Sequence, residues 1–434
     1  KEENPMLTAE QNELLTRVGA GTPGGDMMRR YWHPVGGVDE FSAARSTKRV
    51  RLLGEDLVLF RDRQGRFGLV AEHCPHRRAS LAYGIPTDEG IRCPYHGWHF
   101  DAQGKCLEQP NESAQTCFKE RVSTQAYAVE ELGGMLFAYM GPEPRPLLPR
   151  YDGFVASPAI RMIGQAVVPA NWLQIMENSV DQVHTEWLHG QLHEHLREIQ
   201  GQPAKFSISR RHVRIGFTEF EHGIIKRRLL EGQSEDCDDW QIGHPLVFPT
   251  MLAVGYASPQ WGMYAFQIRT PMDDTHTLHL WYTAYVPPAG AKVAPHLLER
   301  VPVYEVPYLD RHGDYALDMI DAQDIMAWVT QGPIADRTKE NLGSTDQGLA
   351  ILRRMVHREI GKVQRGEDPL GTMRDARANE RIDLPLERDK HHFLDGFASL
   401  LSRVHARHSP FARELVELFQ PGQARAFEEV LDSL

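Results

Sequence analysis

Two short segments of the sequence each combine one cysteine with one histidine. Cys74 and His76 form a C-x-H segment, and after sixteen further residues Cys93 and His96 form a C-x-x-H segment. Thiolates and imidazoles are soft or borderline ligands that bind transition metals. Proline or glycine lies inside or beside each segment, which indicates two tight loops that could hold one metal centre between them.

The order of the ligands separates two kinds of metal centre. A structural zinc site usually takes two cysteines from one loop and two histidines from another element. Here each segment supplies one ligand of each type, on a β-rich background. That arrangement favours a [2Fe–2S] centre in which two imidazoles replace two thiolates at one iron. A zinc-stabilised binding protein is the alternative, and it predicts a colourless protein with no redox role.

The other cysteines do not fit this pattern. The chain has five cysteines, an odd and sparse set for 434 residues, which argues against a disulfide framework. Cys106, Cys117 and Cys237 match neither segment, so we expect them to be buried or incidental thiols. His73 and His99 lie beside the two segments but outside their spacing, and we expect ordinary loop histidines there.

A second group of polar residues follows Asn171 in an otherwise apolar segment that reads as a helix to Leu188. With 100° of rotation per residue, the polar side chains fall within an arc of about 140°. A solvated helix face is the alternative, but this stripe is rich in His, Asn and Gln rather than Lys and Glu. The residues of the stripe are Gln174, Glu177, Asn178, Asp181, His184 and His189.

The two histidines of the stripe could share a metal ion. His184 and His189 are five residues apart, so a local widening of the helix or fraying at Gly190 must bring the imidazoles together. Two histidines and one carboxylate form the ligand set of non-haem Fe(II) oxygenases. The carboxylate is expected downstream, in or beside the helical segment Tyr315–Val329. Periodicity does not choose among the acidic residues there, which are Asp314, Asp318, Asp321 and Asp324.

Together, the two motifs resemble those of the Rieske non-haem iron oxygenases. Cys74–His96 resembles the Rieske signature, and D-x-x-H-x-x-x-x-H at Asp181–His189 resembles the mononuclear-iron motif of the same family. The resemblance covers about Tyr31 to about Arg354 and is strongest to the branch that includes phthalate dioxygenase, chlorobenzoate dioxygenases and aromatic O-demethylases. Further matching segments are RYWHPV at Arg30–Val35, EHGIIKRR at Glu221–Arg228 and GPIADRTKENLGSTD at Gly332–Asp346.

The resemblance implies a set of metal ligands. Asp324 is preferred as the carboxylate ligand because Gln323-Asp324 is followed by an apolar helix and by Gln331-Gly332-Pro333, as in the family, and Asp321 is the reserve. The implied ligands are Cys74, His76, Cys93 and His96 for the cluster and His184, His189 and Asp324 for the iron.

The resemblance also implies a connection between the two centres. The carboxylate at Asp181 would accept a hydrogen bond from His96 of one subunit and from His184 of its neighbour, which fixes both rings. A charge on the helix surface is the alternative for Asp181. Asn178 is expected to support this site through a hydrogen bond, and a bond within its own helix is the alternative.

The implied activity is that of a terminal oxygenase in aromatic catabolism. A separate flavin and iron–sulfur reductase would deliver electrons from NAD(P)H, and O₂ would be the co-substrate. Dihydroxylation of an aromatic carboxylate, similar to phthalate or benzoate, is the main interpretation, and oxidative O-demethylation of a methoxylated lignin-derived acid is the alternative. A Rieske electron carrier is a third hypothesis. The family assembly is a homotrimer, sometimes stacked into a hexamer.

An aromatic carboxylate calls for a cation in the substrate pocket. Lys226, Arg227, Arg228 and Arg269 lie on expected strands, and strand alternation turns only some of them inward. We single out Lys226, Arg228 and Arg269 as candidate substrate contacts. The spacing of the motifs does not identify the substrate.

The elements that must position these residues fall into two parts. Short alternating strands at 51–70, 90–100 and 134–139 indicate a small β domain that ends at the proline-rich linker Gly141–Pro146. Longer strands at 205–220 and 263–286 and helices at 315–329, at 347–365 and from Phe393 onward indicate an α+β second domain. We expect an N-terminal helical segment at 1–25, with a helix near Thr8–Val18, an all-β Rieske domain at 26–145, and a catalytic domain of helix-grip type with C-terminal helices at 146–434.

Composition excludes several functions. The chain is 41% hydrophobic and 25% charged, as in ordinary globular proteins, and its net charge of −11 disfavours nucleic acid and anionic membranes as partners. No apolar run is long enough to span a bilayer, and the first residues have no signal-peptide pattern. We therefore expect a cytoplasmic enzyme; because the sequence does not begin with Met, the chain is expected to be trimmed.

Overall fold

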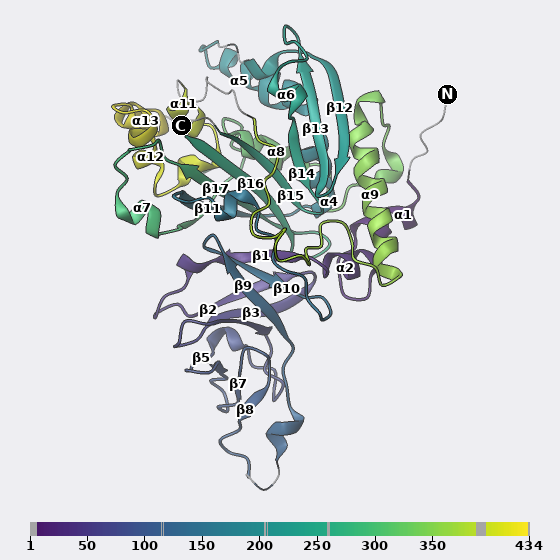
Figure 1. The fold of residues 1–434 in the computed structure, drawn as a ribbon, viewed down its shortest axis with the longest axis vertical. Helices are drawn as coiled ribbons and strands as arrows, with labels where there is room; N and C mark the ends of the chain where they lie inside the picture. Colours follow the sequence, from purple (N-terminus) through teal and green to yellow (C-terminus); the bar gives the residue numbers. More distant parts are fainter. Residues whose placement is uncertain are drawn as a thin grey trace.

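The computed structural model describes residues 7–113, 115, 117–203, 205, 207–257, 261–387 and 396–432. These residues form a smaller β body and a larger body of sheet and helices, which are stacked end to end (Figure 1). The α+β class predicted from the sequence is confirmed. The domain boundary that we propose, the linker Gly141–Pro146, follows the last strand of the smaller body.

The smaller body contains two antiparallel sheets. One has six strands in the order β1-β10-β9-β4-β3-β2, and the other has four in the order β5-β6-β7-β8. The four-stranded sheet lies at the end that points away from the larger body (Figure 1). The strands are β1 (Trp32–Gly37), β2 (Thr47–Leu52), β3 (Glu55–Arg61), β4 (Phe67–Ala71), β5 (Ile85–Pro86), β6 (Ile91–Arg92), β7 (His99–Phe100), β8 (Cys106–Glu108), β9 (Ala126–Leu132) and β10 (Met135–Tyr139).

Two short helices precede this body. Helix α1 (Ala9–Thr16) begins with a capping box, in which Thr8 and Gln11 each bond the other's backbone amide. Helix α2 (Pro23–Met28) begins with a proline in its first turn, where the missing amide costs nothing. The N-terminal helix is therefore confirmed, and α2 crosses the boundary that we expected at residue 25.

The larger body is organised around one eight-stranded sheet. Its order is β12-β13-β14-β15-β16-β17-β11-β18, and only the β11–β18 pair is parallel. The antiparallel sheet predicted for this part of the chain is confirmed. The strands are β11 (Ile160–Val168), β12 (His212–Phe220), β13 (Gly223–Leu230), β14 (His244–Val247), β15 (Met251–Ala257), β16 (Gly262–Pro271), β17 (Thr277–Val286) and β18 (Val303–Glu305).

Helices pack around this sheet. Trp172, Trp281 and Trp328 are fully buried where helices meet the sheet. The helix expected at 315–329 begins only at Ile320, because residues 309–315 form a tight bridged turn. Phe393, the expected start of the tail helices, lies outside the described residues. The helices are α3 (Asp152–Val155), α4 (Trp172–Val180), α5 (Leu192–Ile199), α6 (Asp238–Gln241), α7 (Pro295–Glu299), α8 (Ile320–Val329), α9 (Gln347–Gln364), α11 (Phe397–Leu401), α12 (Ala412–Phe419) and α13 (Ala424–Asp432).

The length and polarity of these helices decide whether any of them could cross a membrane. None in the described part of the chain is both long and apolar enough to cross a membrane.

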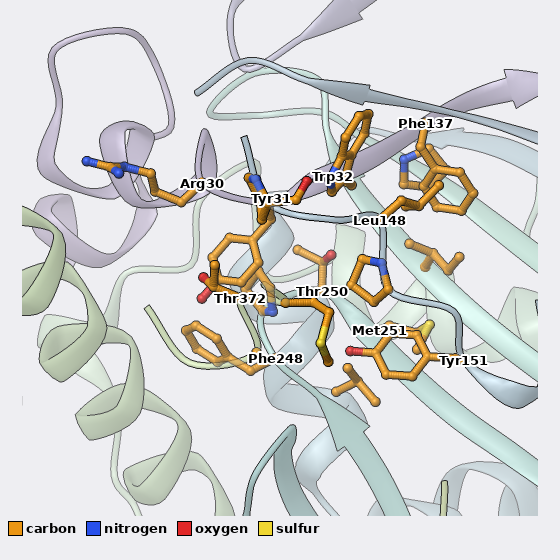
Figure 2. Close-up of a pocket in the computed structure, with 18 of the residues that line it drawn as sticks. Arg30, Tyr31, Trp32, Phe137, Leu148, Tyr151, Phe248, Thr250, Met251 and Thr372 are labelled. Carbon is orange, nitrogen blue, oxygen red and sulfur yellow. Dashed lines mark hydrogen bonds between the residues drawn. The ribbon is translucent and has the colours of Figure 1, made fainter. Parts of the chain in front are cut away.

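The two bodies meet along β1. Trp32 Nε1 donates to Pro146 O at 3.0 Å, and Thr270 Oγ1 of β16 donates to Pro34 O at 2.9 Å. Figure 2 shows a small pocket of about 70 Å³ at this seam, lined by aromatic and aliphatic side chains from both bodies and from the linker. The seam therefore fixes the bodies to each other by direct bonds and close packing.

Candidate metal centres and substrate pocket

The two Cys–His loops of the smaller body share one backbone conformation. The carbonyl of Cys74 accepts a hydrogen bond from Arg78 N at 2.9 Å, and the carbonyl of Cys93 accepts one from Gly97 N at 3.0 Å. The donor residue is left-handed in both loops, with φ of 65° at Arg78 and 75° at Gly97. Two tight turns of the same kind, one after β4 and one after β6, therefore present their side chains to one space.

The side chains of the loops converge. The rings of His76 and His96 have centroids 4.5 Å apart, and His76 stacks on Trp98 at 4.4 Å. The thiols of Cys74 and Cys93 are buried side by side. Burial, together with the charge of the neighbouring Cys93, raises the pKa of Cys74 to about 11. Two adjacent buried sulfur atoms fit a positively charged metal centre, which would stabilise both thiolates.

The remaining three cysteines differ in burial. Cys106 is buried, as expected, and its Sγ lies 3.7 Å from Glu108 O. Cys117 is exposed, and Cys237 is half-buried at the edge of the large pocket described below.

The structure brings His184, His189 and Asp324 together in the larger body. Asp324 Oδ1 lies 3.2 Å from His189 Nε2 and 3.8 Å from His184 Nε2. One ligand atom from each of the three residues lies within 4.8 Å of the others, as one metal ion requires. Asp321, the reserve candidate, accepts a hydrogen bond from His405 N at 2.6 Å instead. The geometry therefore favours Asp324 over Asp321.

A change of helix type brings the two histidines to one side. Helix α4 ends at Val180, and a π-helix runs over Thr185–Gln191, so the local widening expected from the five-residue spacing is confirmed. The expected continuous helix to Leu188 is wrong. Asp181 is extended, and its Oδ1 accepts a hydrogen bond from Val183 N at 2.8 Å, which competes with helical pairing.

The polar stripe divides between two roles. Gln174 and Glu177 face the protein interior: Gln174 Nε2 donates to Trp328 O at 2.9 Å, and Glu177 pairs with two buried arginines. Asn178 and His184 line the large pocket. The stripe is therefore partly structural, which a helical-wheel argument does not distinguish.

The Nδ1 atoms of His184 and His189, which point away from Asp324, have different surroundings. His189 Nδ1 lies 2.9 Å from Gln323 Oε1, and Gln323 Nε2 donates to Leu317 O at 2.7 Å. This chain fixes the amide orientation, so His189 donates its Nδ1 proton to Gln323 Oε1, and its Nε2 faces Asp324. His184 Nδ1 lies 3.6 Å from Asp181 Oδ2, which is longer than a hydrogen bond.

Charge and hydrogen bonds favour the ionised form of Asp181. Burial raises its pKa, but the nearby imidazole of His184 and the amide of Val183 outweigh burial, so the pKa lies below its ordinary value. Asp181 therefore remains an acceptor for more than one N–H donor.

A pocket of about 800 Å³ opens beside His184, His189 and Asp324. Strand side chains form one wall, and residues of the C-terminal helical region form another. This volume is large enough for a substrate of one or two aromatic rings. The strand wall contains Lys226, Arg228, Leu252, Val254 and Gln267, and the C-terminal wall contains Gly396, Leu400 and Arg403.

Lys226 is the predicted substrate cation that is buried in the pocket wall without a partner. Its side chain is 5% exposed, and its ammonium has no hydrogen-bond or ion-pair partner in the part of the chain that the structure describes. Burial, together with the charges of Arg228 and Arg269, lowers the pKa of Lys226 to about 7, although Asp181 and Asp324 act in the opposite direction. An anionic ligand would supply the missing partner.

The other predicted cations have protein partners. Arg228 lines the pocket but bonds Asp239 at 3.3 Å and Thr185 at 3.2 Å. Arg227 projects from the opposite face of β13 and donates to Thr218. Arg269 is buried, does not line the pocket, and donates to Gln267 Oε1 at 2.8 Å, so a direct substrate contact is not supported there.

Comparison with known proteins decides the family. A Rieske [2Fe-2S] domain model matches residues 31–119, a vanillate O-demethylase oxygenase C-terminal domain model matches residues 168–301, and a model described as LigXa C-terminal domain like matches residues 311–383. The chain is 42% identical over 389 residues to the 5,5'-dehydrodivanillate O-demethylase oxygenase subunit of Sphingobium sp., covering 88% of this chain and 88% of that subunit. The chain belongs to the Rieske oxygenases.

Further relatives agree with this assignment. The Rieske oxygenase is 32% identical to the phthalate 4,5-dioxygenase oxygenase subunit of Pseudomonas putida, covering 85% of this chain and 89% of the relative. The solved structure of NdmA from Pseudomonas putida CBB5 matches with a TM-score of 0.58 at 17% identity, covering 80% of this chain and 94% of NdmA, and shows the shared fold. The protein is thus an oxidoreductase, the oxygenase component of a multicomponent system, with a [2Fe–2S] domain.

The two candidate centres of the Rieske oxygenase lie in different bodies. The Cys–His loops border the four-stranded sheet at the far end of the smaller body, whereas α4 and α8 lie within the larger body (Figure 1). Within one chain, therefore, the Cys–His loops of the smaller body lie far from the candidate iron site of the larger body.

Sequence reasoning missed several pocket residues of the Rieske oxygenase. His244, Glu387 and Arg403 line the pocket but belong to no recognised motif. The abundance of histidine was a general signal, and nothing local to Glu387 or Arg403 distinguishes them from surface charges.

Proposed function

We propose that this Rieske oxygenase removes a methyl group from a methoxylated aromatic acid. The observation that carries the proposal is the buried ammonium of Lys226, which has no partner among the described residues and lies in a pocket that opens on His184, His189 and Asp324. An aromatic carboxylate would give Lys226 its partner and would place the ring beside these three residues. The 42% identity to an O-demethylase subunit supports demethylation as the reaction.

The metal ligands that we propose are the residues that converge in each body. Cys74, His76, Cys93 and His96 would hold the [2Fe–2S] cluster, and His184, His189 and Asp324 would hold Fe(II). When bound, the cluster stores an electron and the iron activates O₂.

The protein residues around the iron ligands orient them. Gln323 holds His189 so that Nε2 faces inward, and the unpaired side of the triad faces the pocket. Burial of the triad excludes bulk water from the place where the methoxy group would lie.

The proposed reaction balances with one reductant. Methoxyarene, O₂, NAD(P)H and one proton give the phenol, formaldehyde, water and NAD(P)⁺. The electrons would come from a separate flavin and iron–sulfur reductase. We place the enzyme in the cytoplasm, where NAD(P)H is available.

We further propose that the enzyme assembles as a homotrimer, with a stacked hexamer as a second possibility. The separation of the two candidate centres within one chain supports this assembly (Figure 1). In the trimer, His96 of one subunit would approach Asp181 of the next. Asp181 has an ionised, partly exposed carboxylate beside His184, so it can accept an N–H from each imidazole.

Ring dihydroxylation of an aromatic carboxylate is the second candidate function. It was the main interpretation of the sequence, and the 32% identity to a phthalate dioxygenase subunit supports it. Both reactions use the same iron ligands, so the products must separate them.

Product analysis tests the proposal. Holoenzyme with a matching reductase would be given 4-hydroxy-3-methoxybenzoate, its 5,5'-linked dimer, phthalate and benzoate, while O₂, formaldehyde and ring products are measured. We expect formaldehyde equal to the O₂ consumed with a methoxylated acid. A cis-dihydrodiol without formaldehyde would establish ring dihydroxylation instead, and no O₂ uptake with any aromatic acid would overturn the substrate class.

A further inference from the structure

A glutamine in the wall of the large pocket has one end of its amide fixed by the protein. Gln267 lines the pocket from β16, and Arg269 follows two residues later on the same strand, so both side chains project from one face of the sheet. Arg269 is 1% exposed, and its guanidinium donates to Gln267 Oε1 at 2.8 Å and to Gln267 O at 2.7 Å. One buried cation therefore holds both the side chain and the backbone of Gln267.

The bond to Arg269 determines which atom of the amide can serve a ligand. A guanidinium has only donors, so it must meet the oxygen of the amide and not the nitrogen. A rotation that exchanged the two atoms would place the NH₂ group of Gln267 against the guanidinium. Gln267 Nε2 has no hydrogen-bond partner in the part of the chain that the structure describes. The pocket wall thus presents an amide donor in one orientation.

The sheet separates Gln267 from Lys226. Strands β14 and β15 lie between β13, which carries Lys226, and β16, which carries Gln267. Neighbouring strands are about 4.8 Å apart, so the two backbones are roughly 14 Å apart across the sheet. Lys226 and Gln267 would therefore contact different groups of one aromatic ring.

The neighbours of Gln267 place it on the side of the pocket that holds the candidate iron ligands. Burial raises the pKa of Asp324, but the imidazoles of His189 and His184 and the charge of Arg269 lower it by more. Arg269 is thus close to Asp324. Its partner Gln267 faces the part of the pocket where the reacting group of the substrate would lie.

The chemistry of the amide selects an uncharged acceptor. An amide N–H carries no net charge, so it attracts a carboxylate less than the ammonium of Lys226 does. The oxygen of a methoxy group accepts a hydrogen bond and cannot donate one, and it is bonded directly to the carbon that the proposed reaction oxidises. A donor of fixed orientation on the iron side of the pocket suits this oxygen.

We propose that Gln267 Nε2 donates a hydrogen bond to the oxygen of the methoxy group, and so selects an ether over an alkyl substituent of the same size. This inference rests on the proposed function and names a residue that determines its specificity. Lys226 holds the carboxylate, Gln267 holds the ether oxygen, and the methyl carbon is turned to the candidate iron ligands. Arg269 is a positioning residue, because it acts through the amide of Gln267.

An ethyl substituent tests the inference, because it has nearly the shape of a methoxy group but no acceptor. The probes are 4-hydroxy-3-methoxybenzoate and 4-hydroxy-3-ethylbenzoate, together with the 5,5'-linked dimer of each. Calorimetry on anaerobic holoenzyme measures the affinities. The ethyl group would leave the amide donor without a partner, so we expect each methoxy acid to bind roughly 5- to 20-fold more tightly than its ethyl analogue.

Two substitutions remove the donor in different ways. Gln267→Met keeps the length of the side chain but has no amide. Gln267→Glu keeps an oxygen for Arg269 and replaces the donor by an acceptor, so the buried guanidinium retains its partner. The new charge in Gln267→Glu weakens the binding of every acid, so the ratio of the methoxy to the ethyl affinity is the quantity to compare. In both variants the methoxy acid should lose its advantage.

A matched control uses a glutamine outside the pocket. Gln241 is exposed and donates to Glu235 O at 2.7 Å, so Gln241→Met should leave the ratio unchanged. Iron and sulfide contents and the visible spectrum show whether each variant folds, and Gln267→Glu suffices if Gln267→Met does not fold.

The outcomes separate the inference from the proposed function. If the wild type binds the methoxy and ethyl acids equally, or if the Gln267 variants keep the wild-type ratio, the ether assignment is overturned while the acid substrate stands. If none of the four acids binds, the proposed function fails and the inference fails with it.

Discussion

The amide of Gln323 determines which nitrogen of His189 faces inward. Its Oε1 lies 2.9 Å from His189 Nδ1, and its own amide nitrogen is anchored on Leu317 O. We expect Gln323→Leu to weaken Fe(II) binding by about 10- to 100-fold, because the ring loses its orientation and some basicity. Competition with a ferrous chelator measures the affinity.

A matched variant just beyond the C-terminal end of α8 (Ile320–Val329) separates orientation from helix stability. Gln331 is exposed, and its side chain donates to Ala327 O within the described residues, so Gln331→Leu should leave iron affinity and the cluster spectrum unchanged. Equal iron affinity in Gln323→Leu and wild type would contradict the orienting role.

The carboxylate of Asp181 can accept two N–H donors, whereas an amide offers one acceptor and one donor pair. We therefore expect Asp181→Asn to retain three irons and two sulfides per chain but to lose most of its turnover. Rapid mixing of reduced enzyme with O₂ and substrate would show slow oxidation of the cluster. Normal turnover in this variant would exclude the bridging role.

Residue types and spacing predicted the members of both candidate centres. Thiolate and imidazole ligands in tight loops, and two histidines five residues apart, leave a recognisable pattern in the sequence. Periodicity did not choose between Asp321 and Asp324; the resemblance to the family preferred Asp324, and the structure supports that preference because Asp321 accepts a hydrogen bond from His405 N. The His244–Glu387 pair was not predictable, since it forms only when β14 meets the segment that follows α9.

Helices and strands were predicted where apolar residues recur at the regular spacing of one element type. The long antiparallel strands and α9 were predicted because their apolar periodicity is regular. The end of α4 was not, because a single side-chain bond from Asp181 to the Val183 amide replaces helical pairing. A single hydrogen bond of this kind does not alter the spacing of apolar residues, so the sequence pattern does not reveal it.

Helix α4 is held in place by a buried charge network. Glu177 pairs with Arg337 and Arg353, both at 2.6 Å, and Arg337 is fully buried. We expect Glu177→Gln to lower the free energy of unfolding by about 3–5 kcal/mol, because two guanidinium groups lose their shared anion. Urea unfolding followed by tryptophan fluorescence measures the change.

The neighbouring acid provides the control for this network. Glu340 also pairs with Arg353, but its side chain is 25% exposed, so Glu340→Gln should cost about 1 kcal/mol or less. If the two variants are equally stable, the network contributes little to holding α4.

The C-terminal helical region contains a histidine that resists protonation. Burial, together with the charge of the nearby His408, lowers the pKa of His405 to about 3. The folded state thus keeps His405 neutral, whereas the unfolded chain takes up a proton below about pH 6.5. Stability is lost as pH falls through this range, by about 2 kcal/mol per such group between pH 7.5 and pH 5.

A substitution can isolate this contribution. His405 stacks on Trp281 at 5.3 Å, so His405→Phe keeps an aromatic ring there. We expect the urea midpoint of the variant to fall less between pH 7.5 and pH 5 than that of the wild type. The same slope in both proteins would show that His405 does not contribute to acid sensitivity.

At the scale of the whole molecule, the proposed electron path crosses between subunits. Co-expression of Cys93→Ser, which lacks the cluster, with His184→Ala, which lacks the iron, should restore activity that neither chain has alone. Random mixing in a cyclic trimer joins an intact cluster to an intact iron at roughly a quarter of the interfaces, so about a quarter of wild-type activity is expected. Differently tagged chains allow mixed assemblies to be isolated and assayed. Inactive mixed assemblies would place the path within one chain.

The seam along β1 joins the two bodies by direct hydrogen bonds. Trp32 bonds Pro146 of the linker, and Thr270 of the larger body bonds Pro34, so these contacts hold the two centres of one chain apart. In the proposed trimer, catalysis would require assembled subunits. Dilution below the concentration at which the subunits assemble should abolish activity even though each chain still contains every cofactor. Raising the protein concentration should restore that activity.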